Sequence, residues 1–257
     1  MRWEMLKFPF REDESFVLSA HVNSKIYRGL MKADDLVNSR VVVKQTDLLV
    51  SGLRNLEEEA TALVVKYRQQ IEHYIKRNPY FEKILTPTRR DAFAPRIINS
   101  MIEAASRSGV GPMASVAGAI AEYVGLGLLK YSPEIIVENG GDVFICSKKR
   151  REILILSESS PFFGIRIAIP GSAGPIGVCT SSGQTGHSLS YGKADAVMVV
   201  ETSTTIADSA ATAIANLIMR VSDIKRGIKR AQEIGVRGVL ILFGEQIGAW
   251  GQFEILG

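Results

Sequence analysis

The sequence contains little cysteine and little histidine, and this scarcity excludes several classes of protein. Two cysteines, Cys146 and Cys179, are too few for a disulfide scaffold, and no Cys-x-x-Cys motif or Cys/His cluster indicates a zinc or iron–sulfur site. The first eleven residues are charged and aromatic, so they lack the apolar core and cleavage site of a secretion signal. These absences predict a cytoplasmic protein.

Repeats of 20 to 50 residues and low-complexity linkers are also missing, so residues 1–257 are expected to form a single domain. A hydrophobic content of 46% excludes a disordered chain. The net charge of +4 comes from the first hundred residues, without an aromatic-interleaved basic face, and this argues against nucleic-acid binding. The basic run at 148–151 separates two apolar segments and predicts a solvated hairpin turn.

Apolar and polar residues alternate around 16–22 and 41–43, which predicts a small N-terminal sheet over about 15–52 that is part of the domain. Helical spacing begins at Asn55. The apolar stretch 110–129 has the length of a membrane span, but it contains Glu122 and is rich in Ala and Gly. It therefore predicts a helix buried in the core, and no membrane segment.

The second half of the chain mixes strands with two further helices. A small-residue helix is expected over 205–220, and another helix between an N-cap at Asp223 and a C-terminal glycine at Gly235. Strands are expected at 134–138, 142–146, 152–156, 164–169, 176–180, 194–200, 238–243 and 253–256. Grouped helices and runs of strands predict an α+β domain with antiparallel or mixed sheets around central helices rich in small residues.

Two glycine-containing segments could bind a ligand. Gly111 and Pro112 open the first small-residue helix, where exposed backbone amides favour phosphate, although a plain turn explains them equally. The second segment comprises Asn139, Gly140, Gly141 and Asp142. It suits either a tight hairpin or a loop that approaches a cofactor closely.

Two further segments carry polar side chains. Residues 180–188 concentrate hydroxyls and glycines after a strand, and His187 among them could transfer protons or be a solvated loop residue. Asp208 and Thr212 lie one helical turn apart. Their oxygens could bind magnesium, or Asp208 could cap its own helix.

In order, these four segments resemble the ApbE superfamily of FAD:protein FMN transferases, and the whole chain resembles more closely an uncharacterised family related to it. The most specific match is Ala207, Asp208, Ala211 and Thr212. The family's lysine after the first segment is absent here, and the sequence that follows His187 also differs. Only Glu122 could replace the family's next aspartate.

The resemblance implies an ApbE-like fold, a flavin nucleotide (FAD or FMN), magnesium and an acceptor protein. It implies metal binding by Asp208, Thr212 and the backbone of Ala114, and makes His187 the base that deprotonates the acceptor hydroxyl. Cofactor binding would involve the two glycine-containing segments and the end of the later strand, that is Gly111, Pro112, Asn139, Gly140, Gly141, Asp142, Thr180, Ser181, Ser182 and Gly183.

Two alternatives remain open beside this magnesium-dependent, transferase-like enzyme. One is a non-catalytic protein that binds a flavin or another nucleotide. The other is a structural or assembly protein whose basic N-terminal segment binds a partner, with the glycines serving only turns.

Overall fold

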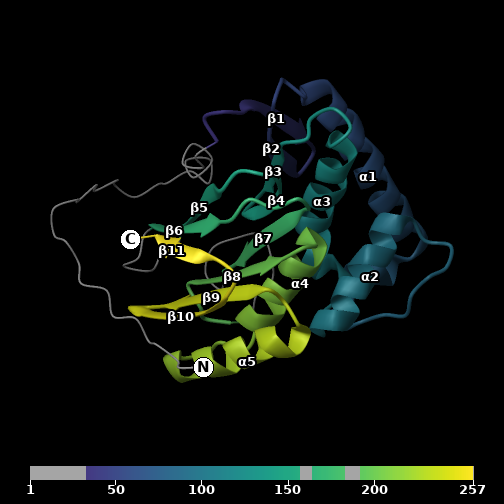
Figure 1. Cartoon of the computed structure of the whole chain (residues 1–257). Coiled ribbons are helices and arrows are strands. Elements are labelled where there is room, and N and C mark those ends of the chain that lie inside the picture. The colour runs from purple at the N-terminus through teal and green to yellow at the C-terminus, as the bar shows by residue number, and fades with distance from the viewer. Residues whose placement is uncertain (1–32, 157–163, 183–191, 257) are drawn as a thin grey trace.

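The computed structural model describes residues 33–156, 164–182 and 192–256, which form three layers (Figure 1). The central layer is an eight-stranded antiparallel sheet in the order β1-β2-β3-β4-β7-β8-β9-β10. Its strands are β1 (Val37–Val43), β2 (Thr46–Gly52), β3 (Ile135–Asn139), β4 (Asp142–Cys146), β7 (Ile176–Ser181), β8 (Ala196–Glu201), β9 (Gly238–Phe243) and β10 (Gln246–Gly251). A smaller sheet in the order β11-β6-β5 contains β5 (Arg151–Leu156), β6 (Gly164–Ile169) and β11 (Glu254–Leu256).

Helices form the third layer, against the face of the large sheet opposite to the small sheet (Figure 1). They are α1 (Glu57–Arg77), α2 (Arg96–Ser108), α3 (Val116–Leu128), α4 (Thr204–Ala215) and α5 (Ile224–Ile234), with short 3-10 turns η2 (Pro79–Glu82), η3 (Pro112–Ser115) and η4 (Val221–Asp223). The α+β class expected from the sequence is therefore confirmed.

Strand alternation explains why the core is divided between the two faces of the large sheet. In β4, Val143 and Ile145 point towards the small sheet, whereas Phe144 packs among the helices. Such two-sided burial requires apolar residues at nearly every strand position. A polar residue inside these strands is therefore an exception that needs a partner.

The small-residue helices lie deep in the helical layer because their glycines permit close packing. A side-chain carbon at Gly125 would lie 2.2 Å from the Phe144 ring, and one at Gly118 would lie 2.6 Å from the Thr204 carbonyl oxygen. The predicted buried helix at 110–129 is thus confirmed as η3 followed by α3. No helix among the described residues combines the length and apolar character that crossing a bilayer requires.

Several boundaries differ from the prediction. Helix α4 ends at Ala215, not Arg220, because tight turns at Leu217 and Ile218 follow it. Strand β10 was not expected. It pairs antiparallel with β9, and the two strands form a hairpin. Gly235 ends α5 in the left-handed conformation, as predicted. The strand expected near residues 16–22 lies outside the described residues.

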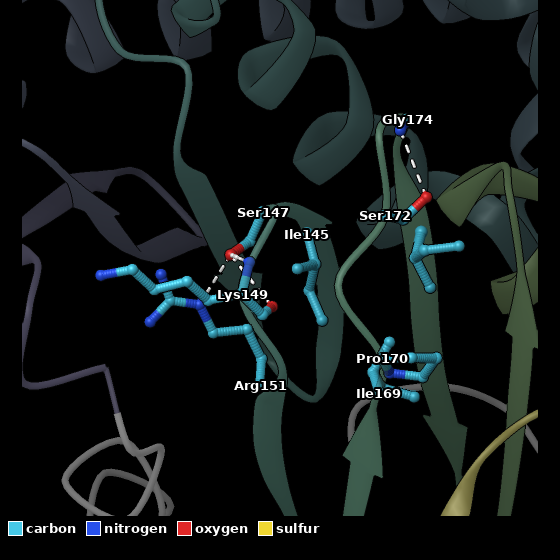
Figure 2. Close-up of a pocket in the computed structure, with 9 residues that line it drawn as sticks. Ile145, Ser147, Lys149, Arg151, Ile169, Pro170, Ser172 and Gly174 are labelled. Atoms are coloured by element: carbon cyan, nitrogen blue, oxygen red, sulfur yellow. Dashed lines mark hydrogen bonds between the residues drawn. The ribbon is translucent and has the colours of Figure 1, made fainter.

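The hairpin predicted at the basic run 148–151 is wrong. Strand β4 pairs with β3 and β7, whereas β5 pairs with β6, so the run connects two sheets. Arg151 is buried there, and its guanidinium donates to Ser147 Oγ at 2.9 Å (Figure 2). The guanidinium also pairs with Asp35 and Glu134. The depression drawn in Figure 2 leaves no volume for a ligand, so this cluster is structural.

Candidate functional site

The Asn139–Asp142 segment forms a two-residue hairpin between β3 and β4. Gly140 and Gly141 have φ angles of 64° and 104°, which only glycine adopts readily. The amide of Gly141 donates to the Glu138 carboxylate at 3.0 Å, and the Asn139 side chain donates to the Ala117 carbonyl at 2.9 Å. The hairpin thereby brings Asp142 to the helical face of the large sheet, beside the start of α3.

Helix α4 begins at the same place, and its first turn is capped without Asp208. Ser203 Oγ accepts from the Ile206 amide, and the carboxylate of Glu122 accepts from Ser203 Oγ and from the Thr205 amide and hydroxyl at 2.7–2.8 Å. An anion at a helix N-terminus is favourable. Glu122 therefore stabilises the start of α4.

Asp208 lies inside α4 and interacts with another helix. Its Oδ2 accepts a hydrogen bond of 2.8 Å from the Gly118 amide, in the first turn of α3. The Asp142 carboxyl group also forms a hydrogen bond with the Asp208 carboxyl group. The structure thus brings together two acidic residues that lie far apart in the sequence.

The pKa values of both carboxyl groups are raised, and burial is the main cause for each. Burial raises the pKa of Asp208 to about 7, although the hydrogen bonds with Gly118 and Asp142 oppose the shift. For Asp142, burial and then the charge of Asp208 raise the pKa well above the usual value. Among the described residues, no lysine or arginine forms an ion pair with either group.

Buried oxygen atoms without partners occur in the acidic pair and on the neighbouring strand β7 and helix α4. Asp142 Oδ1, Ser181 Oγ and Thr204 Oγ1 are buried, and none of them has a hydrogen-bond partner in the structure. Buried polar atoms normally have partners, so these atoms suit a bound cation, water or ligand. The part of the chain that the structure describes contains no group of three or more His, Cys, Asp or Glu side chains arranged for a metal. A cation here would therefore need hydroxyl, carbonyl or ligand oxygens besides the carboxylates.

The other candidate residues have more varied surroundings. Gly111 packs tightly against the backbone of Ile84, since a side-chain carbon would lie 1.8 Å from the Ile84 carbonyl oxygen. Pro112 is buried in η3, which also contains Ala114. Thr212 is buried one turn after Asp208.

The end of β7 places its hydroxyl residues on both faces of the large sheet. Ser181 shares the helical face with Cys179, while Thr180 alternates to the opposite face with Val178. Ser182 follows directly after the strand. Gly183 and His187 lie outside the described residues.

Sequence reasoning missed two residues that shape this site, Gly177 and Cys179. A side-chain carbon at Gly177 would lie 2.4 Å from Thr204 Cα. The Cys179 thiol donates to the Thr204 carbonyl at 3.3 Å, and burial raises its pKa well above the usual value. Isolated small residues in strands and helices were the available signal, but only the fold shows which surfaces they bring together.

Several known proteins are similar to this chain in sequence or in fold. UPF0280 proteins of Methanocaldococcus jannaschii and Methanopyrus kandleri are each 36% identical to the chain, over 84% of its length and 91% of theirs. The flavinyl transferase ApbE of Pseudomonas stutzeri has a similar fold, with a TM-score of 0.50 at 14% identity, covering 84% of this chain and 94% of that protein.

The ApbE protein of Thermotoga maritima is also similar in fold, with a TM-score of 0.53 at 11% identity, covering 80% of this chain and 94% of that protein. At such low identity, the likeness concerns the fold. The model of the family described as AbpE bacteria matches residues 28–237. The chain therefore belongs to this ApbE-related family, together with the UPF0280 proteins.

Proposed function

We propose that the protein binds a flavin nucleotide, FAD or FMN, together with a magnesium ion at the carboxyl groups of Asp142 and Asp208. The observation that carries the proposal is the buried acidic pair, which has no cationic partner among the described residues. Two adjacent buried carboxylates are unfavourable unless they share a proton or bind a cation. The fold that the chain shares with flavin transferases makes a flavin nucleotide the ligand to test first.

The donors around the pair fit magnesium. The ion prefers hard oxygen ligands, and commonly uses one or two carboxylates with water and substrate phosphates. Asp208 and Asp142 would supply carboxylate oxygens, and the family resemblance adds the Thr212 hydroxyl and the Ala114 carbonyl. The bound ion would supply positive charge to the phosphates of the nucleotide.

The nucleotide would lie against the neighbouring backbone turns. Gly140 has no atom within 4 Å of where its side-chain carbon would be, so a ligand can approach its backbone closely. The unpartnered Ser181 hydroxyl is available to a polar ligand group. By resemblance Gly111, Pro112 and residues 180–183 would complete the site.

Transfer of FMN to an acceptor protein is the finer part of the proposal. The acceptor hydroxyl oxygen would bond to the phosphorus of the FMN half while the bond between the two phosphates breaks. AMP would leave with the bonding electron pair, and His187 would take the acceptor proton. Without an acceptor, the protein would bind the nucleotide and release nothing.

Flavin titration with and without magnesium tests the proposal. We expect FAD or FMN to raise the melting temperature and to change the flavin fluorescence, with tighter binding when magnesium is present. Asp208→Asn should abolish the magnesium effect while the amide oxygen still accepts from Gly118. Asp47→Asn, which changes a half-buried carboxylate in an ion pair with Arg40, is the matched control. Absence of flavin binding under both conditions would refute the proposal.

Product analysis then separates an enzyme from a binding protein. FAD incubated with the protein, magnesium and candidate acceptor proteins should release AMP if transfer occurs. Tight flavin binding without AMP release would instead support the non-catalytic alternative. His187→Ala should abolish AMP release and leave flavin affinity unchanged.

A further inference from the structure

We propose that the surface cavity between α1, α2 and α3 is a second ligand site, and that it binds a small organic anion with a flat ring. The cavity has a volume of about 420 Å³. Its lining includes Lys66, Tyr67, Gln70, Arg96, Tyr123 and Gly127. None of these residues belongs to the flavin and magnesium site proposed above. The proposal therefore does not depend on that function.

Charge is the first argument for an anionic ligand. Lys66 and Arg96 line the cavity, and no acidic residue lines it with them. Within the described ranges, neither cation forms an ion pair with a carboxylate. The exposed acidic or basic side chains of a protein surface are usually solvated, but two cations that line one hollow attract the same anion.

Helix α2 adds to this positive potential. Arg96 is its first residue, the first turn contains no acidic residue, and no side chain caps the helix after Pro95. The N-terminus of a helix carries a partial positive charge, so a cation there is unfavourable without an anion nearby. An anionic ligand next to Arg96 would interact with the guanidinium and with this end of the helix.

Tyrosine rings are the argument for a flat ring in the ligand. Tyr67 and Tyr123 pack edge to face, with centroids 5.2 Å apart and planes at 70°. The Lys66 ammonium lies 5.3 Å from the centre of the Tyr67 ring, and the Tyr123 hydroxyl is fixed by a 2.8 Å hydrogen bond with Ser100. Rigid aromatic side chains provide stacking surface at little entropic cost.

The size of the cavity fits a small molecule. Ligand pockets usually have volumes of about 300 to 1,000 Å³, so this cavity is at the lower end of that range. Gly127 contributes no side chain to it, and Leu126, which is 44% exposed, adds an apolar edge. A ring would contact the tyrosines and Leu126, while its anionic group would pair with Lys66 and Arg96.

Binding of 1-naphthyl phosphate to the full chain, without magnesium, tests this inference. The backbone amide signals of Tyr67 and Gly127, followed by NMR, should shift in a saturable manner, while those of Gly118 and Gly141 at the acidic pair stay unchanged. Inorganic phosphate lacks the ring and 1-naphthol lacks the charge, so each should bind at least about tenfold more weakly. Equal affinity for inorganic phosphate or 1-naphthol would overturn the proposal, as would shifts confined to Gly118 and Gly141.

Surface variants provide the second readout. Arg96→Gln and Lys66→Gln should each weaken binding of 1-naphthyl phosphate about fivefold or more, because each removes a charge from the cavity. Arg77→Gln is the matched control, since Arg77 is an exposed arginine in the last turn of α1 outside the cavity. Unchanged affinity in both cavity variants would show that the cations do not recognise the ligand.

Discussion

Two clusters of ionisable side chains lie in different parts of the molecule, one around Arg151 and one around Asp208. The first contains charges of both signs, and the second contains acidic groups alone. Around Arg151, the carboxylates of Asp35 and Glu134 neutralise the guanidinium, and hydrogen bonding to Arg151 keeps the pKa of Asp35 well below its usual range. Around Asp208, a second carboxyl group is adjacent, and the pKa values of both are raised.

This difference separates a structural cluster from a candidate binding site. The Arg151 cluster connects the two sheets and needs nothing from solution. The Asp142–Asp208 pair is stable only with a proton or a cation. Burying two adjacent carboxyl groups destabilises the fold by itself, but it provides a site that can bind a cation. The following variants test the distinction, beginning with the largest expected effect.

Replacing Arg151 should cause the largest loss of stability. Arg151→Ala removes the buried guanidinium and leaves Glu134 without its cation, while Asp35 keeps its ion pair with Lys149. The change should lower the free energy of unfolding by about 3 kcal/mol. Urea denaturation monitored by circular dichroism measures the change. The control is Arg40→Ala, which removes an exposed ion pair with Asp47 and should cost less than about 1 kcal/mol. Equal effects of the two variants would contradict a structural role for the buried cluster.

Adding a methyl group between α3 and α4 should have the next largest effect. In Gly118→Ala the new carbon would lie 2.6 Å from the Thr204 carbonyl oxygen and 2.7 Å from Asp208 Cβ, so the helices must separate. We expect a loss of about 2 kcal/mol. The same change at Gly174, where no atom lies within 4 Å of the added carbon, should alter stability by less than about 0.5 kcal/mol.

Removing the charge of Asp208 should change stability in the opposite direction. Above pH 7 without magnesium, Asp208→Asn should stabilise the protein by about 1 to 2 kcal/mol, because repulsion with Asp142 disappears and the bond from Gly118 remains. In the unfolded chain the Asp208 carboxyl group loses its proton near its usual pKa of 3.8, whereas in the folded wild type it keeps the proton up to about pH 7. The stability of the wild type should therefore fall between about pH 4 and pH 7.

The stability difference between this variant and wild type should therefore be small at pH 4 and constant above about pH 7. Urea titrations across this range measure it. Magnesium should reduce the difference above pH 7 by stabilising only the wild type. A wild type that is more stable than the variant at pH 8 without magnesium would contradict the raised pKa of Asp208.

The sequence allowed the fold class and the local elements to be predicted, because periodicity and turn residues act over short distances. Strand β4 matches the prediction for this reason, and the hairpin at Gly140 and Gly141 is one of the two alternatives that the sequence left open. Sheet membership depends on pairing between distant segments, so the connection at 148–151 was misassigned as a hairpin. Local cues also left open a role for Asp208 as the cap of its own helix, whereas its carboxylate accepts a hydrogen bond from the Gly118 amide, 90 residues away in sequence.

Glu122 provides the smallest expected effect and the sharpest contrast with Asp208. One oxygen of its carboxylate, Oε2, accepts three hydrogen bonds from Ser203 and Thr205 at the start of α4. Glu122→Gln keeps an acceptor there and loses only the interaction of the charge with the helix dipole, about 0.5 kcal/mol. Glu122→Ala also removes the acceptor and should cost about 1 to 2 kcal/mol. Thermal unfolding measures both variants, and the response to magnesium should persist in Glu122→Gln. Loss of that response would place Glu122 among the cation ligands. Glu122 would then not differ in role from the Asp142–Asp208 pair.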